Sequence, residues 1–123
     1  MQSDICAMNN YALFIAKKIH EIRGKKVMLD ADLAELFGIT TKVFNQAIRR
    51  NQKRLPLDFM FQLTENEWKV LRSQIVTLKS GSGKHRKYLP FAFTEHGVAM
   101  LSGILRSETA VRMNISIIRT FIH

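Results

Sequence analysis

Cysteine is nearly absent from the sequence: Cys6 has no second cysteine to pair with, so no disulfide framework exists and a reducing compartment is predicted. Long apolar runs are also missing, because no stretch approaches the roughly 20 residues that cross a bilayer. The N-terminus shows no basic segment followed by an apolar run and a cleavage site, which argues against secretion. We therefore expect a cytoplasmic location and no membrane as a partner.

Acidic residues are scarce relative to basic ones. Asp and Glu number 10 against 19 Lys and Arg, which gives a formal net charge of +9. The chain is nevertheless 46% hydrophobic, which favours a folded domain with a core over a disordered chain. A large positive charge on a folded protein favours a polyanionic partner.

Internal repeats and Pro- or Ser-rich linkers are absent too, so the 123 residues predict a single domain. We expect residues 1–18 to form an N-terminal tail or short amphipathic segment and residues 19–123 to form the domain. The pattern predicts a hairpin at 20–29 that turns at Arg23-Gly24-Lys25, and paired strands at 57–63 and 88–93. Helices are predicted at 30–37, 41–50, 64–78, 94–105 and from 108 onward, with a capping box at Thr64-Glu65-Asn66-Glu67. The predicted fold class is α+β: a helix–turn–helix with small antiparallel β elements and additional C-terminal helices.

The segment 30–49 carries the helix–turn–helix pattern. Asp30 is placed to accept from the free N–H groups of a first helix, and Gly38 stands where a left-handed residue ends it. Ala34 is small enough for a second helix to pack closely, and Ile39 fills the corner between the two. The shared core is predicted to contain Leu33, Phe37, Phe44, Ala47 and Ile48.

The second helix, 41–50, is capped by Thr40 or Thr41 and has two unlike faces when wound at about 100° per residue. Its inner face is predicted to hold Val43, Phe44, Ala47 and Ile48. Its outer face has no acidic residue and is predicted to hold Thr41, Lys42, Asn45, Gln46, Arg49 and Arg50, with Lys53 and Arg54 just beyond. Asn and Gln suit adenine edges and Arg suits guanine, whereas Lys42, Lys53 and Arg54 suit phosphates. We predict that these residues bind double-stranded DNA; a merely solvated polar face is the alternative.

A basic, glycine-containing loop is predicted at 79–87. It does not match a nucleotide-binding phosphate loop, because Leu78 stands where the first glycine is required and His85 replaces the hydroxyl residue. A wing beside the second helix fits the composition better. We predict contacts to the DNA backbone from Lys84, Arg86 and Lys87; a flexible, solvated loop is the alternative.

No catalytic or cofactor-binding constellation is visible in the sequence. The four histidines are scattered and Cys6 has no partner at metal-site spacing, so we predict neither a metal nor a cofactor. No Ser or Cys nucleophile with an oriented base is recognisable, and we predict that the chain is not an enzyme. The aromatic residues of the predicted strands can stack on single-stranded bases, but core positions are favoured for Phe59, Phe61, Tyr88, Phe91 and Phe93.

Many blocks of the sequence, in order, resemble the ORF6N domain. These blocks are Ile22-Arg23-Gly24, Val27-Met28-Leu29-Asp30, Asp32-Leu33-Ala34-Glu35-Leu36, Asn45-Gln46-Ala47, Arg50-Asn51, Asp58-Phe59-Met60-Phe61-Gln62-Leu63-Thr64, Tyr88-Leu89-Pro90, Phe93-Thr94-Glu95-His96-Gly97-Val98-Ala99-Met100-Leu101 and Asn114-Ile115. The resemblance runs from about Ile19 to Phe121. The family occurs in bacteriophages and prophage-like loci and is related to the KilA-N and Bro-N modules. The resemblance implies a sequence-specific DNA-binding domain of a phage-type antirepressor or transcription regulator, located at the bacterial nucleoid.

The final helix is apolar on much of its circumference, through Ile115, Ile118, Phe121 and Ile122. Such a helix either packs fully into the domain or is covered by a partner, a second copy or a following C-terminal segment. A protein–protein interaction module acting through helix 108–123, as a homodimer or with another protein, is therefore the alternative function. RNA binding is a third possibility.

Overall fold

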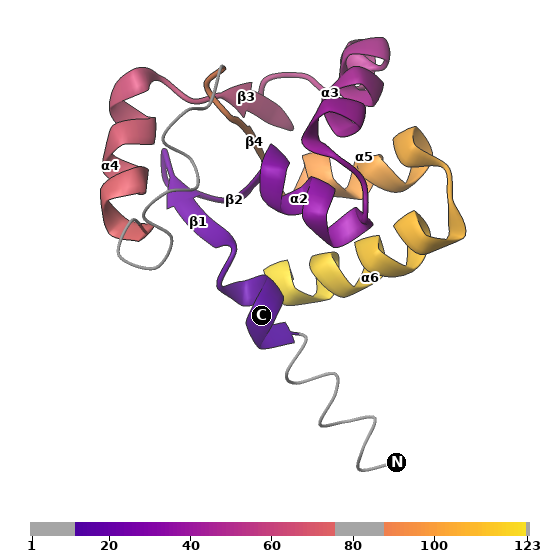
Figure 1. Ribbon diagram of the computed structural model, residues 1–123. Helices are drawn as coiled ribbons and strands as arrows, with labels where there is room; N and C mark the ends of the chain where they lie inside the picture. The colour runs from indigo at the N-terminus through magenta and orange to yellow at the C-terminus, as the bar shows by residue number, and fades with distance from the viewer. Residues whose placement is uncertain (1–11, 76–87, 123) are drawn as a thin grey trace.

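The computed structural model describes residues 12–75 and 88–122, which form a mixed α+β fold (Figure 1). One antiparallel sheet has the strand order β1-β2-β4-β3, formed by β1 (Ile19–Ile22), β2 (Lys25–Leu29), β3 (Met60–Gln62) and β4 (Phe91–Phe93). The helices are α2 (Asp30–Phe37), α3 (Thr41–Arg50), α4 (Glu65–Ile75), α5 (Glu95–Leu105) and α6 (Glu108–Ile122), with a 3-10 turn, η1 (Gln52–Arg54), after α3. The predicted α+β class, with small antiparallel strands and helices towards the C-terminus, is confirmed.

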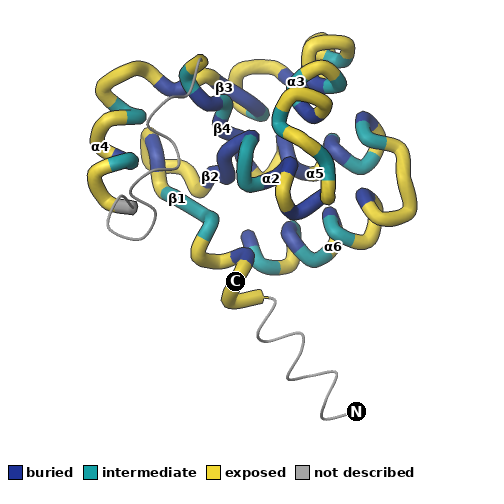
Figure 2. Tube along the Cα trace, in the orientation of Figure 1, coloured by how far each residue is buried: buried dark blue, intermediate teal, exposed yellow. Residues whose placement is uncertain are grey.

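Two hydrophobic clusters lie on opposite faces of the sheet, because successive residues of a strand point to opposite sides. The face towards α2, α3, α5 and α6 contributes Met28, Met60 and Phe93 to the larger cluster. The face towards α4 contributes Val27, Phe61 and Ala92 to a smaller one, which Leu71 and Trp68 of α4 complete. Figure 2 shows the buried segments gathered where the sheet meets the helices.

The predicted hairpin is present, and its two-residue turn consists of Arg23 and Gly24. Both turn residues have positive φ angles, 56° and 75°, as a type I′ turn requires. An arginine seldom adopts this conformation, but here its side chain is fixed. Arg23 donates to both carboxylate oxygens of Glu67, at 2.8 and 3.0 Å, and lies over the Phe61 ring. The turn thereby joins the hairpin to α4.

The capping box at the start of α4 is confirmed. The Thr64 hydroxyl accepts from the backbone N–H of Glu67 at 3.1 Å, and the Glu67 carboxylate accepts from the backbone N–H of Thr64 at 2.8 Å. The same carboxylate therefore caps its own helix and receives Arg23 of the hairpin. These hydrogen bonds lower the pKa of Glu67 to about 2, with the bond from Arg23 as the largest cause.

The predicted strand 57–63 is shorter in the structure. The Pro56 carbonyl accepts from the backbone N–H groups of Phe59 and Met60, so residues 57–59 form a turn and only Met60–Gln62 is a strand. Leu57, the first residue of the predicted strand, is 82% exposed as a result. The predicted pairing with the strand before α5 is confirmed over β4, and β4 also pairs with β2.

The start of α5 is fixed to this turn. Thr94 caps the helix by accepting from the Gly97 N–H, and its hydroxyl donates to the Asp58 carbonyl at 2.9 Å. A Cβ atom at Gly97 would collide with the carbonyl oxygen of Phe59. Only glycine therefore permits this close approach between α5 and the chain before β3.

The segment before β1 packs against the domain. Residues 12–16 are helical, and Ile15 is buried in the cluster that also contains Ile117 and Phe121 of α6. This part of the predicted segment 1–18 is an amphipathic turn, because Leu13 and Phe14 on its other side are exposed. Residues 1–11 lie outside the described residues.

Candidate nucleic-acid interface

The turn between α2 and α3 is closed by backbone hydrogen bonds. Gly38 has a φ of 74° and donates to Glu35 O at 3.1 Å, while Ile39 donates to Ala34 O at 3.0 Å. This pair of bonds is a Schellman motif, which needs a left-handed residue at the position of Gly38. The predicted end of the first helix is confirmed. Thr40, one of the two predicted caps, then accepts from the Val43 N–H at 3.1 Å and begins α3.

The start of α2 agrees with the predicted range 30–37, but Asp30 does not occupy the N-cap position. Helix α2 begins at Asp30 itself, and the residue in the capping position is Leu29, which supplies no side-chain cap. The Asp30 carboxylate instead accepts from the N–H of Ala31 at 2.8 Å and from the side chain of Asn45. Asp30 is 1% exposed, so this carboxylate is an interior link between α2 and α3.

The rotation of α3 about its axis is set by two buried side chains. Phe44 is fully buried and meets the Phe93 ring edge-on at 5.5 Å between centroids. Ile48 lies one turn later on the same side and is also buried. Ala47 and Ile39 pack against this cluster from the edges. The predicted shared core of the two helices is confirmed for these residues and for Leu33 and Phe37.

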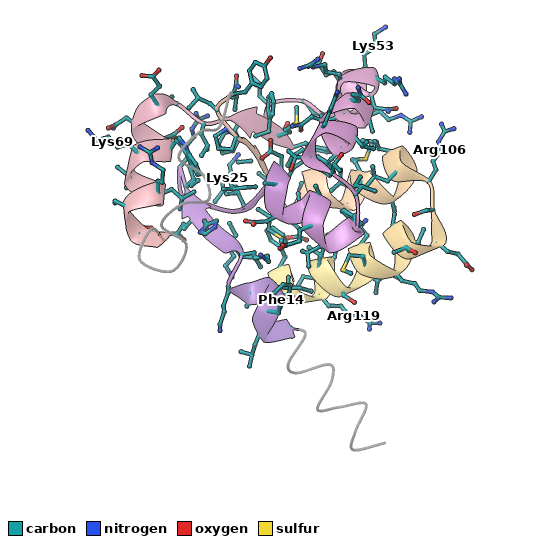
Figure 3. All side chains as sticks on the ribbon, viewed as in Figure 1. Phe14, Lys25, Lys53, Lys69, Arg106 and Arg119 are labelled. Atoms are coloured by element: carbon teal, nitrogen blue, oxygen red, sulfur yellow. The ribbon has the colours of Figure 1, made fainter. Side chains whose placement is uncertain are left out.

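The outer face of α3 carries most of the side chains predicted there. Those exposed on the helix are Lys42, Gln46, Arg49 and Arg50. Lys53 and Arg54 are exposed on η1, which continues from the same end, and Lys53 points outward in Figure 3. Thr41 is half-buried at the start of the helix. These exposed side chains form the α3 surface: Lys42, Val43, Gln46, Arg49, Arg50, Lys53 and Arg54.

Asn45 departs from its predicted outward position. Its Nδ2 donates to Oδ2 of buried Asp30 at 3.3 Å, and its Oδ1 is buried without a hydrogen-bond partner in the described structure. Both ends of the amide are therefore turned into the domain. The physical reason is the interior carboxylate on α2, which a hydrophobicity pattern does not reveal.

Val43 shows the opposite difference from the prediction, since it lies on the exposed side of α3 and not on the inner face. It was predicted to face the core, but it is 49% exposed and belongs to the α3 surface. Because Phe44 and Ile48 define the centre of the inner face, Val43 lies on the outer side of the helix, next to Gln46 at i+3 and Arg50 at i+7. Sequence reasoning missed this residue because an apolar side chain was assigned to the core by default.

The charges of the α3 surface have no acidic neighbour in the part of the chain that the structure describes. Within residues 12–75 and 88–122, no carboxylate lies within 4 Å of the charged groups of Lys42, Arg49, Arg50, Lys53 or Arg54. The sequence explains part of this, since no Asp or Glu occurs between Glu35 and Asp58. The surface is consequently a concentrated, unneutralised positive patch.

Arg106 extends this patch and was not predicted. It ends α5 with a left-handed φ of 49°, and its Nε donates to Gly103 O at 3.3 Å. Nη1 of Arg54 lies 3.8 Å from where a Cβ of Gly103 would be, so both arginines border this exposed glycine. Lys53 and Arg106 point outward on the same side of the molecule in Figure 3. Arg54 and Arg106 are brought together by packing of α3 on α5. A local sequence pattern therefore cannot predict that they are neighbours.

The remaining predicted residues are placed as follows. Lys84, Arg86 and Lys87 of the basic loop lie outside the described residues. Phe61 and Phe93 are buried and Phe59 and Phe91 are half-buried, which agrees with core positions, whereas Tyr88 is 63% exposed. Within the described residues, no group of His, Cys, Asp and Glu is arranged to hold a metal ion. No described helix has the length and apolarity that crossing a membrane requires.

Fold and surface together define an α+β domain with a helix–turn–helix, in which the exposed cations of α3 have no carboxylate within 4 Å among the described residues. The model of the ORF6N domain family matches residues 17–104, from just before β1 to the last turn of α5. The chain therefore belongs to the ORF6N domain family, as the sequence blocks predicted, and α3 lies inside the matched range. No curated protein and no solved structure matches the chain significantly.

Proposed function

We propose that this domain binds double-stranded DNA with α3 in the major groove. The observation that carries the proposal is the α3 surface, where exposed arginine, lysine and glutamine side chains have no acidic neighbour among the described residues. An α-helix fits the width of the major groove, and a recognition helix contacts base edges there. The negative phosphates supply the counter-charge that the described residues do not place beside α3.

The side chains divide between base reading and positioning. Gln46 in the middle of α3 and Arg49 in its last turn are exposed and are suited to bidentate contacts with adenine and guanine, respectively. Lys53 and Arg54 follow the helix and contact phosphates, which fix the register without reading sequence. Arg106 adds a phosphate contact from the end of α5. Asn45 has no base-reading role in this proposal, since its amide is held by Asp30.

The loop 79–87 is proposed as a second contact with the DNA backbone. Lys84, Arg86 and Lys87 supply its charge. Changing Lys84→Ala is expected to weaken binding to all duplexes alike, because a phosphate contact carries no base information. The biological role proposed with this activity is regulation of phage or prophage genes, as transcription regulator or antirepressor. No catalytic step and no cofactor enters the proposal.

The test is selection of bound duplexes from a random pool, followed by affinity measurements over a range of salt concentrations. Each lost phosphate contact should reduce the slope of log affinity against log salt by about 0.9. We expect this reduction for Lys53→Ala. Lys69→Ala is the matched control, because Lys69 is an exposed lysine on α4, at the opposite side of the molecule (Figure 3). Binding that is independent of salt, or equal slopes in both variants, would contradict the proposal.

A second candidate function is protein–protein interaction through α6. Val111, Ile115 and Ile122 are exposed along one side of this helix, at spacings of four and seven residues. An apolar stripe of this kind is typical of helix–helix contacts. Sedimentation of the chain over a range of concentrations, with Ile115→Glu as the disrupting variant, tests whether a second copy covers it. Dimer formation is compatible with DNA binding, since paired half-sites are read by dimers.

A further inference from the structure

Val43 is the one apolar side chain on the α3 surface, and it belongs to neither of the two hydrophobic clusters formed by the described residues. Its side chain is 49% exposed, whereas the next residue, Phe44, is fully buried. Valine is also a poorer helix former than Lys42 and Gln46 beside it. Neither packing nor helix propensity therefore accounts for a valine at this position.

The neighbours of Val43 are the residues that would meet base edges. It is the third residue of α3, and the N-terminal part of a recognition helix contacts the bases. Gln46 lies at i+3, where side chains on a helix are adjacent. The amide of Asn45 does not face outward here, because it is bound to Asp30 and its Oδ1 is buried. The base-reading groups at this end of α3 are thus one amide and one branched apolar side chain.

We propose that Val43 and Gln46 form an A·T-reading pair, in which Val43 packs on the 5-methyl group of thymine and Gln46 hydrogen-bonds adenine. The proposal rests on the proposed function and adds its base preference. The thymine methyl is the apolar group that bases expose in the major groove, and it distinguishes T from C there. Gln46 offers the donor and acceptor that match N7 and N6 of adenine.

The experiment removes the DNA methyl and the protein methyls separately. A duplex selected by the unaltered chain is resynthesised with deoxyuridine in place of each thymine in turn, which deletes only the 5-methyl group. At one or more positions the change should weaken binding about fourfold, the value of one buried methyl group. The same change should weaken binding by Val43→Ala much less, because this variant has lost the two γ-methyl groups that would pack on the thymine methyl. In parallel, 7-deazaadenine should weaken binding by the unaltered chain at an adjacent pair, but not by Gln46→Ala.

The matched control is Val70→Ala. Val70 is 52% exposed and lies on α4, away from the α3 surface, so its loss changes the same chemistry at an unrelated place. This variant should keep the full response to deoxyuridine. Far-ultraviolet circular dichroism of all variants checks the helix content, which alanine at exposed helix positions should preserve.

The outcomes distinguish the A·T-reading pair from DNA binding itself. Coupling between Val43 and one thymine methyl supports the A·T-reading pair. Salt-dependent duplex binding in which deoxyuridine has no effect, or weakens Val43→Ala equally, overturns the pair and leaves DNA binding intact. Failure of the unaltered chain to bind any duplex overturns both.

Discussion

Cations on two sides of this domain are used differently. At the hairpin, Arg23 is held by two hydrogen bonds to Glu67 and rests on the Phe61 ring at 4.2 Å. On the α3 surface, Arg49 and Arg50 have no carboxylate within 4 Å among the described residues. Charge that is neutralised internally serves the fold, whereas charge left unneutralised is available to another molecule. The comparison separates the structural arginines of this protein from its proposed ligand-binding ones.

Lys18 belongs with the structural group. Its Nζ lies 3.0 Å from Oε1 of Glu35 and 3.6 Å from Oδ1 of Asp32, and it thereby ties the segment before β1 to α2. Burial alone would lower the pKa of Lys18, but the two carboxylates outweigh it and the pKa is raised. Burial raises the pKa of Asp32 despite the nearby ammonium group. Lys18, like Arg23, therefore has its counter-charges inside the domain.

The largest expected effect contrasts Arg49→Ala with Arg23→Ala. Loss of Arg49 should weaken binding to a selected duplex by about 1–3 kcal/mol and relax the preference at one base pair, while the free energy of unfolding changes by less than about 0.5 kcal/mol. Loss of Arg23 should lower stability and leave the affinity unchanged. Titration with duplex DNA gives the affinity of each variant, and urea unfolding gives its free energy of unfolding. The comparison breaks if Arg23→Ala loses affinity as Arg49→Ala does.

Asn45 lies on α3 beside the proposed DNA-binding cations, but its amide is held by buried Asp30. Its substitution therefore tests the division between structural and DNA-binding residues. Asn45→Ala removes a hydrogen bond to the buried carboxylate of Asp30, so the free energy of unfolding should fall by about 1–2 kcal/mol. The base preference found by duplex selection should stay the same. Asn45→Asp should destabilise more, because it places a second carboxylate beside Asp30. A variant with normal stability and altered base preference would return Asn45 to the DNA-reading face.

Local chemistry made much of the fold predictable from the sequence. Gly38 ends α2 because glycine tolerates a left-handed conformation, and Thr64 and Thr94 cap helices through their own hydroxyls. The Arg23-Gly24 turn follows from the same conformational preference of glycine. In each case the residues that determine the structure are within a few positions of one another.

Contacts between distant residues account for what the sequence did not reveal. The rotation of α3 depends on Phe44 meeting Phe93, and on Asp30 holding Asn45. A pattern of apolar residues within 41–50 contains neither partner, so Val43 and Asn45 were assigned to exchanged faces. Arg106 reaches the patch only through packing of α5 on α3. The candidate site was therefore predictable in its location and general chemistry, but not in its exact membership.

Arg106 permits a test in which stability and binding change in opposite directions. Glycine adopts its left-handed conformation without strain, so Arg106→Gly should raise the free energy of unfolding by roughly 1 kcal/mol. The same variant should lose one phosphate contact, with a decrease of about 0.9 in the salt slope. Arg106→Ala is the matched variant, because it loses the charge and keeps the strained backbone. If Arg106→Gly binds DNA with an unchanged slope, this arginine is a helix-capping residue only.

The smallest expected effect concerns the ion pair between Arg23 and Glu67 and the dependence of its contribution on pH. The pKa of Glu67 is lowered to about 2 from its usual 4.5, mainly by the hydrogen bond from Arg23. A carboxyl group whose pKa is lower in the folded state stabilises the fold above the unfolded value, and this contribution disappears as the pH falls from about 4.5 towards 2. Because the ion pair is partly exposed to solvent, we expect its contribution at neutral pH to be no more than about 1 kcal/mol. The difference in unfolding free energy between the unaltered chain and Glu67→Gln should therefore shrink on acidification over this range. A difference that is constant with pH would mean that ionisation of Glu67 adds nothing to stability, and Arg23 would then lose its place among the structurally paired cations.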